Sequence, residues 1–380
     1  MPTINDIAAV ADSMGKCRIK VIEDACVVVR NRNAACRACE KVCPHGAIKA
    51  QGNTLTISSS LCVECGACVA VCPTEAIVSL EPSDAELAEA AARSLAANDG
   101  MAVFACARIN AKQLADPERY AVVPCLARLE ESLLLALVGV GATELVLVDG
   151  TCQTCKHRDC VRAVDEVIAQ VDRLLAAHDS TVRVQRASAF PAELAVEDSR
   201  SLKGSSRRGF ISEAARTAKE AAMSAAQATI AKELGIDIAE RNISERLRVG
   251  EDGRMPLVEM PRHERAINAL DAIGAPRVDV ISSRLFGTVS IDVEKCNACG
   301  VCTVFCPTGA LRRDPAKKPS ETVRYIEFSA SECVQCKLCY DACWKRCIKV
   351  SSDVPADELY DFEPRTFVML KNSQRRNPAW

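Results

Sequence analysis

The sequence predicts an α+β protein in which two cysteine-rich modules are arranged around a small parallel α/β domain, with a helical connector before the second module. Three observations predict this. The 23 cysteines occur in a first, a central and a last group, and residues 161–295 contain none. A strand, cysteine loop and short helix recur in the first and last groups. In the centre, short apolar runs alternate with helical segments.

Composition and charge narrow the class of protein. Aromatic residues make up 4% of the chain, so metal sites or covalent links are expected to supplement the core. The net charge of −2 predicts no nucleic-acid binding. The first residues lack an export signal, and the longest apolar run, 133–140, is too short to cross a membrane. We therefore expect a cytoplasmic protein without direct membrane insertion, whose cysteines bind metal rather than form disulfides.

The composition also shifts along the chain and suggests five regions. We expect a first module over 1–82, a central domain over 98–187, a helical connector over 188–284, a second module over 285–350 and a C-terminal tail over 351–380. In the connector, Ser205 and Ser206 are suited to cap a helix over about 207–234, and a short helix is expected over 262–273.

The repeat in the modules occurs four times, in two pairs. Its frame is Cys-Pro-x-x-Ala followed by Ile or Leu, and it begins at Cys43, Cys72 and Cys306. The fourth copy begins at Cys343, where Trp344 replaces the proline and Cys347 the alanine. Strand-like runs at 55–57, 289–291 and 325–328 precede the last three copies. Each module is therefore expected to contain two copies of the same unit.

The central domain has a different pattern. Short apolar runs at 101–106, 120–125 and 144–148 are interpreted as strands, and a further strand is expected at 181–185. The segments 130–140 and 161–177 have helical periodicity. Alternation of strands and helices is typical of a parallel sheet.

Three cysteine runs with the spacing Cys-x2-Cys-x2-Cys-x3-Cys carry the chemistry, and they begin at Cys62, Cys296 and Cys333. Three thiolates on one tight loop can reach three corners of a cubane, while the fourth cysteine points away from it. The first copy has Asn33 where this first cysteine is expected. We favour Cys26 as the displaced ligand, with Cys17 as the alternative. Zinc in paired Cys-x2-Cys knuckles is the competing interpretation, and the following Cys-Pro disfavours it.

These runs resemble two-cluster bacterial ferredoxins over about 15–80 and 285–350. The resemblance implies four 4Fe–4S clusters with crossed ligation. We name the implied ligand sets by number: site one is Cys26, Cys36, Cys39 and Cys72; site two is Cys62, Cys65, Cys68 and Cys43; site three is Cys296, Cys299, Cys302 and Cys343; site four is Cys333, Cys336, Cys339 and Cys306. Cys347 either packs beside site three or replaces Cys343, and His45 is placed to tune a cluster by a hydrogen bond.

The central cysteines resemble those of the delta subunit of methyl-viologen-reducing hydrogenase over about 100–186. The resemblance rests on three features. These are the Cys-x4-Cys segment that ends in Asp159-Cys160, the Cys-x2-Arg spacing that begins at Cys125, and the order of the expected strands and helices. It implies a small α/β domain with a 2Fe–2S cluster, whose ligands form a central site: Cys106, Cys125, Cys155 and Cys160. This sequence departs from the family in having Ile109 where a second cysteine is expected and an extra cysteine, Cys152, which could replace one ligand. Metal-free thiols, or a redox dithiol at Cys152 and Cys155, are the alternatives.

These features predict an iron–sulfur electron-transfer protein that relays single electrons between redox enzymes in anaerobic metabolism. The central resemblance implies a hydrogenase, a formate dehydrogenase or a heterodisulfide-reductase-type complex as partner, with this chain as an oxidoreductase subunit. Two other hypotheses remain. The central domain could reduce a disulfide or sulfur compound with Cys152 and Cys155, or residues 200–275 could bind a redox enzyme during its maturation.

Overall fold

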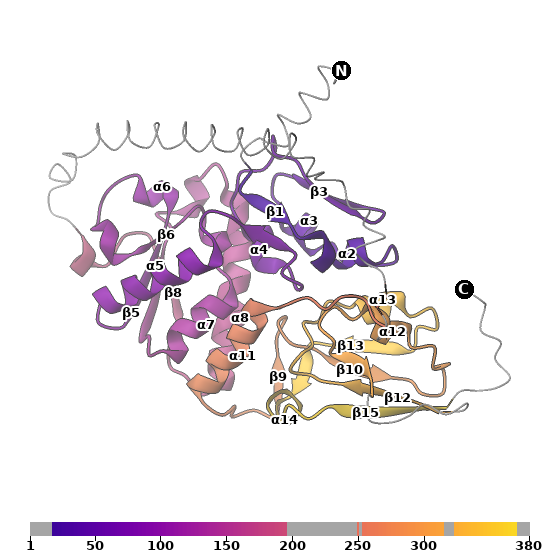
Figure 1. Cartoon of the computed structure of the whole chain (residues 1–380). Coiled ribbons are helices and arrows are strands. Elements are labelled where there is room, and N and C mark those ends of the chain that lie inside the picture. Colours follow the sequence, from indigo (N-terminus) through magenta and orange to yellow (C-terminus); the bar gives the residue numbers. More distant parts are fainter. Residues whose placement is uncertain (1–16, 196–248, 251–252, 315–322, 371–380) are drawn as a thin grey trace, which may run out of the picture.

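The computed structural model describes residues 17–195, 249–250, 253–314 and 323–370 (Figure 1). The predicted mixture of α and β structure, with a parallel sheet in the centre, is confirmed. The helix expected over 207–234 and its capping serines lie outside the described residues. In the described part of the chain, we find no helix that combines the length and apolar character required to cross a membrane.

The N-terminal module is built from two antiparallel strand pairs and short helices. Strand β1 (Ile19–Val21) pairs with β4 (Ile77–Ser79), and β2 (Ile48–Gln51) pairs with β3 (Thr54–Ile57). The helices between the strands are η1 (Glu23–Ala25), α2 (Val27–Arg30), α3 (Ala38–Val42) and α4 (Ala67–Val71). The sequence did not predict β1, because three residues with one buried side chain carry almost no pattern.

The central domain contains a four-stranded parallel sheet. Its strands, in spatial order, are β6 (Ala121–Val123), β5 (Met101–Cys106), β7 (Glu144–Val148) and β8 (Val184–Ala187). One face of the sheet packs on the long helices, which are α5 (Asp84–Ala97), α7 (Glu131–Gly139) and α8 (Val161–Ala177). The other face is covered by short elements that include α6 (Ala107–Asn110) and η6 (Ala192–Leu194). The remaining short helices are η2 (Pro117–Arg119), η3 (Leu126–Arg128), η4 (Cys152–Thr154) and η5 (Arg158–Cys160).

Helix α5 was not predicted, although its start carries a local signal. Ser83 and Glu86 form a capping box, in which the Glu86 amide donates to the Ser83 hydroxyl and the Ser83 amide donates to the Glu86 carboxylate. The short helix predicted over 262–273 is observed as α11 (Pro261–Ile273). It packs closely on α7, because Gly139 leaves room for its backbone: a Cβ there would lie 3.1 Å from the carbonyl oxygen of Ala269.

The C-terminal module repeats the arrangement of the first. Strand β10 (Thr288–Ile291) pairs with β13 (Ile348–Ser351), and β11 (Leu311–Arg313) pairs with β12 (Val323–Phe328). Its helices are α12 (Val301–Phe305) and α13 (Leu338–Ala342). The chain beyond residue 350, expected to be a tail, adds α14 (Ala356–Tyr360) and two strands that pair with earlier ones: β14 (Asp353–Pro355) with β9 (Val280–Ser282), and β15 (Arg365–Leu370) with β12.

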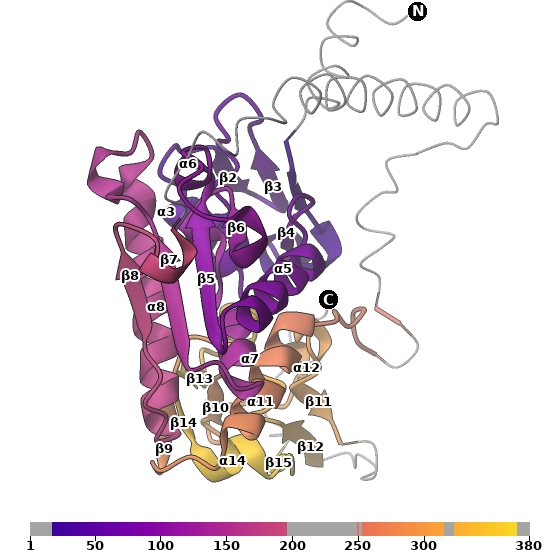
Figure 2. The same ribbon diagram turned by 90° about the vertical axis from the view of Figure 1, so that its left-hand side faces the viewer.

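The two modules lie side by side, next to the central domain, as both views show (Figures 1 and 2). The two modules flank the central domain in the sequence, but in the folded chain they contact each other. Leu338 of α13 is buried within the core of the N-terminal module. The Ala35 amide also donates a hydrogen bond of 2.7 Å to the carboxylate of Asp341. This contact brings the cysteine loops of the two modules together.

Candidate functional site

Sites three and four lie within the C-terminal module. The structure brings the four cysteines of site three around one small cavity, and those of site four around a second. The cysteine loops turn tightly because residues within them have positive φ angles, as at Ala298 (57°) and Gly300 (77°). Cys347 lines the site three cavity, with its sulfur 3.4 Å from that of Cys343. Cys347 therefore lies directly beside site three, next to Cys343.

Site two lies in the N-terminal module, where its four cysteines and His45 surround a third small cavity. The thiol of Cys17 lies against Cys62 and contributes to raising its pKa. Cys17 was the alternative ligand for site one, yet its thiol lies beside site two. Cys17 therefore lies beside site two rather than among the cysteines of site one.

At site one, the structure brings Cys26 together with the cysteines of the first loop and with Cys72. Burial, and then the nearby thiols of Cys72, Cys36 and Cys26, raise the pKa of Cys39 to about 12. Cys26 is buried directly before α2, so that backbone N–H groups of Val28 and Val29 face its sulfur. Asn33, which stands at the position of the missing cysteine, is exposed. Cys26, from the turn directly before α2, thus supplies the thiol that the loop lacks.

The donor groups at these sites are suited to a cluster. Burial raises the pKa of most of the thiols, and that of Cys333 reaches about 12. A metal cluster must therefore displace protons as it binds. Backbone amides donate to three of the crossing sulfurs, from Ala47 to Cys43 (3.3 Å), from Ala76 to Cys72 (3.3 Å) and from Leu311 to Cys306 (3.4 Å). Such hydrogen bonds stabilise thiolates and tune iron–sulfur clusters.

Arg30 provides an independent observation that fits a negatively charged group at site four. This arginine belongs to the N-terminal module and is 4% exposed. One of its nitrogens donates to the carbonyl of Asp24 (2.9 Å), whereas its Nε and Nη2 lack hydrogen-bond partners in the described structure. Burial lowers its pKa, and the thiolates of Cys306 and Cys336 oppose that shift. A buried cation with two unpaired nitrogens is costly, and an anionic cluster would compensate it.

The central cysteines meet at the carboxyl ends of the parallel strands. Cys106 ends β5, Cys125 follows β6, and the loop with Cys155 follows β7. Burial raises the pKa of Cys106, and the neighbouring thiolates of Cys125 and Cys155 raise it further. Ligands commonly bind at this edge of an α/β sheet. Cys160 hydrogen-bonds with Cys125, so the structure gathers all four residues of the central site.

The extra cysteine lies beside this group. Burial and the carboxylate of Asp149 raise the pKa of Cys152 to about 12. The thiolate of Cys125 contributes to the same shift, which places Cys152 near the central site. A nucleophilic thiol requires a lowered pKa, so this environment disfavours Cys152 as a reactive dithiol partner.

A contact between site two and the central site was not predicted. A hydrogen bond with Cys160 lowers the pKa of Cys65 to about 7 and also lowers that of Cys125. Next to it, Nε2 of His45 and Nδ1 of His157 are 3.0 Å apart. Burial and nearby positive charge lower the pKa of His157, which keeps that ring neutral near pH 7. The sequence held no signal for these contacts, because the partners belong to different domains.

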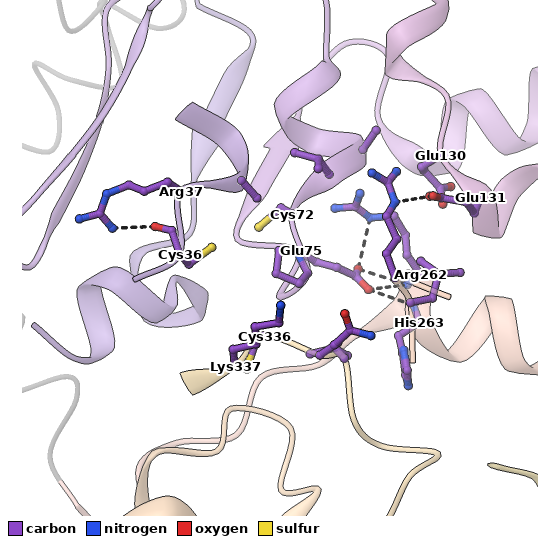
Figure 3. A pocket seen from close by; sticks show the side chains of 18 of the residues that line it. Cys36, Arg37, Cys72, Glu75, Glu130, Glu131, Arg262, His263, Cys336 and Lys337 are labelled. Atoms are coloured by element: carbon purple, nitrogen blue, oxygen red, sulfur yellow. Dashed lines mark hydrogen bonds and ion pairs between the residues drawn. The ribbon is translucent and has the colours of Figure 1, made fainter. Parts of the chain in front are cut away.

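The two modules, α11 and the start of α7 line an open cavity of about 540 Å³, which we name the junction cavity. The sulfur atoms of Cys36 and Cys72 point toward each other at one side of it (Figure 3). On another side, Arg262 donates a hydrogen bond of 2.7 Å to the carbonyl of Val69 and forms an ion pair of 3.4 Å with Glu75. Arg262 is 6% exposed and ties α11 to the N-terminal module. It thereby holds the cavity wall in place.

Comparisons with known proteins agree with the two modules. The family model of the 4Fe–4S dicluster domain matches residues 11–76 and 295–347. Over 49 residues the chain is 49% identical to Ferredoxin-3 of Chlorobaculum tepidum, a match that covers 11% of this chain and 79% of that protein. These matches show 4Fe–4S domains at both ends and support clusters over the zinc interpretation.

Two further relatives match over shorter shares of their length. The chain is 50% identical over 42 residues to one of the subunits of the ion-translocating oxidoreductase complex of Methanosarcina acetivorans, and 29% identical over 128 residues to the RNA polymerase subunit Rpo3 of Methanosarcina mazei. These matches cover 11% and 32% of this chain, and it spans only 16% and 42% of these two relatives. No solved structure matches the chain significantly.

Proposed function

Because the chain belongs to the 4Fe–4S dicluster ferredoxins through its two terminal modules, we propose that it relays single electrons between redox enzymes along a row of clusters. Bound clusters of this type exchange single electrons, at potentials set by hydrogen bonds, charge and solvent exposure. The chain's own contribution is to hold the thiolates, to supply the hydrogen bonds and to set the distance between neighbouring sites.

The observation that carries this proposal is the order of the cysteine groups in space. Thiolates of sites three and four influence each other through Cys302 and Cys339. Those of sites four and one do so through Cys336 and Cys36, across the module contact. Sites one and two meet through Cys39 and Cys68, while site two meets the central site at Cys160.

The row therefore runs from site three through four, one and two to the central site. This order supports a relay better than a storage role, because successive sites influence one another from one module to the next. Among the cysteines of the described structure, only one is exposed, and it lies at the site-three end of the row. Cys299 of site three is exposed, and Trp344 beside it is 47% exposed. At the other end, Cys106 and Cys155 are partly exposed. We infer that electrons enter and leave at these two ends.

We propose the ligands as follows, in the numbering of the sites. The four 4Fe–4S clusters are held by Cys26, Cys36, Cys39 and Cys72; by Cys62, Cys65, Cys68 and Cys43; by Cys296, Cys299, Cys302 and Cys343; and by Cys333, Cys336, Cys339 and Cys306. A 2Fe–2S cluster at the central site is held by Cys106, Cys125, Cys155 and Cys160. The gathering of these thiols supports the assignment, and Cys152, which the thiolate of Cys125 influences, is the candidate substitute.

The partners that we propose are a hydrogenase, a formate dehydrogenase or a heterodisulfide-reductase-type complex, in anaerobic metabolism. The support is the central domain, with its parallel sheet and its cysteines at the carboxyl edge. A relative named as a subunit of an oxidoreductase complex is in keeping with a subunit role. The disulfide-reductase hypothesis is weaker, because the raised pKa of Cys152 opposes nucleophilic attack. Most of residues 200–275, on which the maturation hypothesis depends, lie outside the described residues.

The relay is tested by interrupting the row at its middle. Anaerobic full-length protein is reduced with a limiting amount of a low-potential donor, and electron paramagnetic resonance follows which sites become reduced and whether their spins interact. We expect magnetic interaction between neighbouring sites in the wild type. With Cys26→Ser, the signal of site one should be lost, and electrons should distribute separately over the two halves of the row. If electrons in the Cys26→Ser variant still equilibrate between the two halves as in the wild type, the relay is contradicted.

A further inference from the structure

Arg30 differs from the other buried arginines of the protein in lacking a carboxylate partner. In the described part of the chain three arginine side chains are buried. Two of them are paired, Arg128 with Asp84 and Arg262 with Glu75 at 3.4 Å. Arg30 forms no ion pair with a described residue, and its Nε and Nη2 donate no hydrogen bond there. A buried ion is costly unless it is paired, so the groups around Arg30 decide what it does.

The guanidinium of Arg30 faces the site of the other module. Arg30 ends α2, which begins directly after Cys26 of site one, and its amide donates a hydrogen bond of 2.9 Å to the carbonyl of Cys26. Burial lowers the pKa of the guanidinium, and the charges that oppose this shift most strongly are the thiolates of Cys306 and Cys336 in site four. The carboxylate of Asp24 opposes it less. A helix of the N-terminal module therefore presents its cation to a site of the C-terminal module.

The packing at the module contact keeps Arg30 in this place. Leu338, which lies in the site four loop, is fully buried within the core of the N-terminal module, and Cys336 and Phe305 pack against the same core. Phe305 directly precedes Cys306, so both site four cysteines that act on Arg30 adjoin this contact. If the modules separate, water reaches Arg30 and screens its interaction with site four. The charge of Arg30 therefore acts fully on site four only while the modules are docked.

The charge at site four changes during the proposed relay. A 4Fe–4S cluster held by four thiolates is anionic, and an electron that it accepts makes it more negative by one charge. A buried cation stabilises the more negative form more strongly, because the interaction energy grows with the charge. Arg30 therefore favours the reduced state of site four. Because the modules must be docked for this stabilisation, reduction must in turn favour docking by the same factor.

We propose that Arg30 couples the electron on site four to the contact between the two modules, so that the modules dock more tightly when site four is reduced. The proposal rests on the proposed function only in requiring that site four accepts an electron. That electron comes from the donor of the relay, and no bond is formed or broken. The contact that the electron must cross is thus firmest while the electron is at site four.

The test compares oxidised and dithionite-reduced full-length protein, kept anaerobic with its clusters bound. Hydrogen–deuterium exchange with mass spectrometry follows the amides of Arg30 and Asn31, which donate to the carbonyls of Cys26 and Val27 within α2. Redox titration followed by electron paramagnetic resonance gives the potential of site four. Arg30→Met removes the charge and keeps an apolar side chain, whereas Arg30→Lys keeps the charge. Arg32→Met removes an exposed arginine two residues further on and is the matched control.

In the wild type, reduction should slow the exchange of these amides by roughly tenfold, the size expected when one charge is added several ångström from a buried cation. Arg30→Met should abolish this difference and lower the potential of site four by about 59 mV, which is the same tenfold factor for a one-electron couple. Arg30→Lys should retain most of both effects, and Arg32→Met should change neither. A purely structural role of Arg30 predicts the opposite ranking, because a buried methionine packs at lower cost than a buried lysine.

Equal exchange in the two redox states of the wild type would overturn the coupling, and so would a redox difference that survives in Arg30→Met. If Arg30→Lys loses the difference as completely as Arg30→Met, charge is not the cause and the proposal fails as well. Each of these results with a reducible site four leaves the relay standing. A site four that accepts no electron would overturn both the relay and the coupling.

Discussion

The contact between the N-terminal module and the central domain depends on Gly66, and a substitution there tests the packing directly. Gly66 has φ of 78°, and a Cβ at this position would lie 2.5 Å from Cδ and 2.9 Å from Cβ of Arg128. Arg128 is 1% exposed, and its guanidinium pairs with Asp84. Because Arg128 cannot move aside, Gly66→Ala is expected to force the two domains apart locally.

The repeat offers a matched control at Gly300. Its φ is 77°, but the nearest atom to an added Cβ is a nitrogen of the exposed Arg313, at 3.4 Å. Both substitutions carry the cost of the left-handed conformation, about 1–2 kcal/mol. Gly66→Ala alone adds the cost of overpacking, about 1–3 kcal/mol. The comparison therefore isolates the crowding by Arg128.

The assay is the rate at which an iron chelator removes each cluster under anaerobic conditions, because that rate follows local opening of the site. With a factor of ten for each 1.4 kcal/mol, Gly300→Ala should accelerate loss from site three by roughly 5- to 30-fold. Gly66→Ala should accelerate loss from site two by roughly a further 5- to 150-fold. If the two variants lose their clusters at the same relative rate, Arg128 does not crowd Gly66 and the packing described for this contact is wrong.

Four further outcomes are expected. Anaerobic analysis should find about 16 irons in the four-iron clusters and about 2 more centrally; a total near eight would refute the four-cluster assignment. Cys26→Ser should abolish one four-iron signal whereas Cys17→Ser should retain all four, and the reverse result would move the ligand to Cys17. Arg30→Met should lower the potential of site four, since it removes a buried positive charge beside it; an unchanged potential would contradict the role of Arg30. Reconstitution of the apoprotein should be favoured by rising pH, because burial raises the pKa of thiols such as Cys39 to about 12 and these must lose protons to bind metal; a flat pH profile would count against it.

The cysteine spacing, together with the crossed ligation that the resemblance to two-cluster ferredoxins implies, predicted the four-residue sets that the structure gathers. Each loop is a local motif, so the distance between its thiols is set by a few backbone angles rather than by the remainder of the chain. Cys26 was chosen because Asn33 cannot replace a thiolate, and the structure places the buried Cys26 beside the other three cysteines of its set. The strands of the central domain were likewise visible as short apolar runs, because a parallel sheet buries both of its faces.

The arrangement of the sites in space was decided only by tertiary packing. Nothing in the sequence relates Cys65 to Cys160, or Arg30 to Cys336, because each pair joins segments that are distant along the chain. The repeat showed Lys337 at a glycine position, but only the packing of the two modules against α11 gives it a cavity to face. Local motifs determine which residues can hold a cluster. The burial of apolar surface between domains determines which clusters become neighbours.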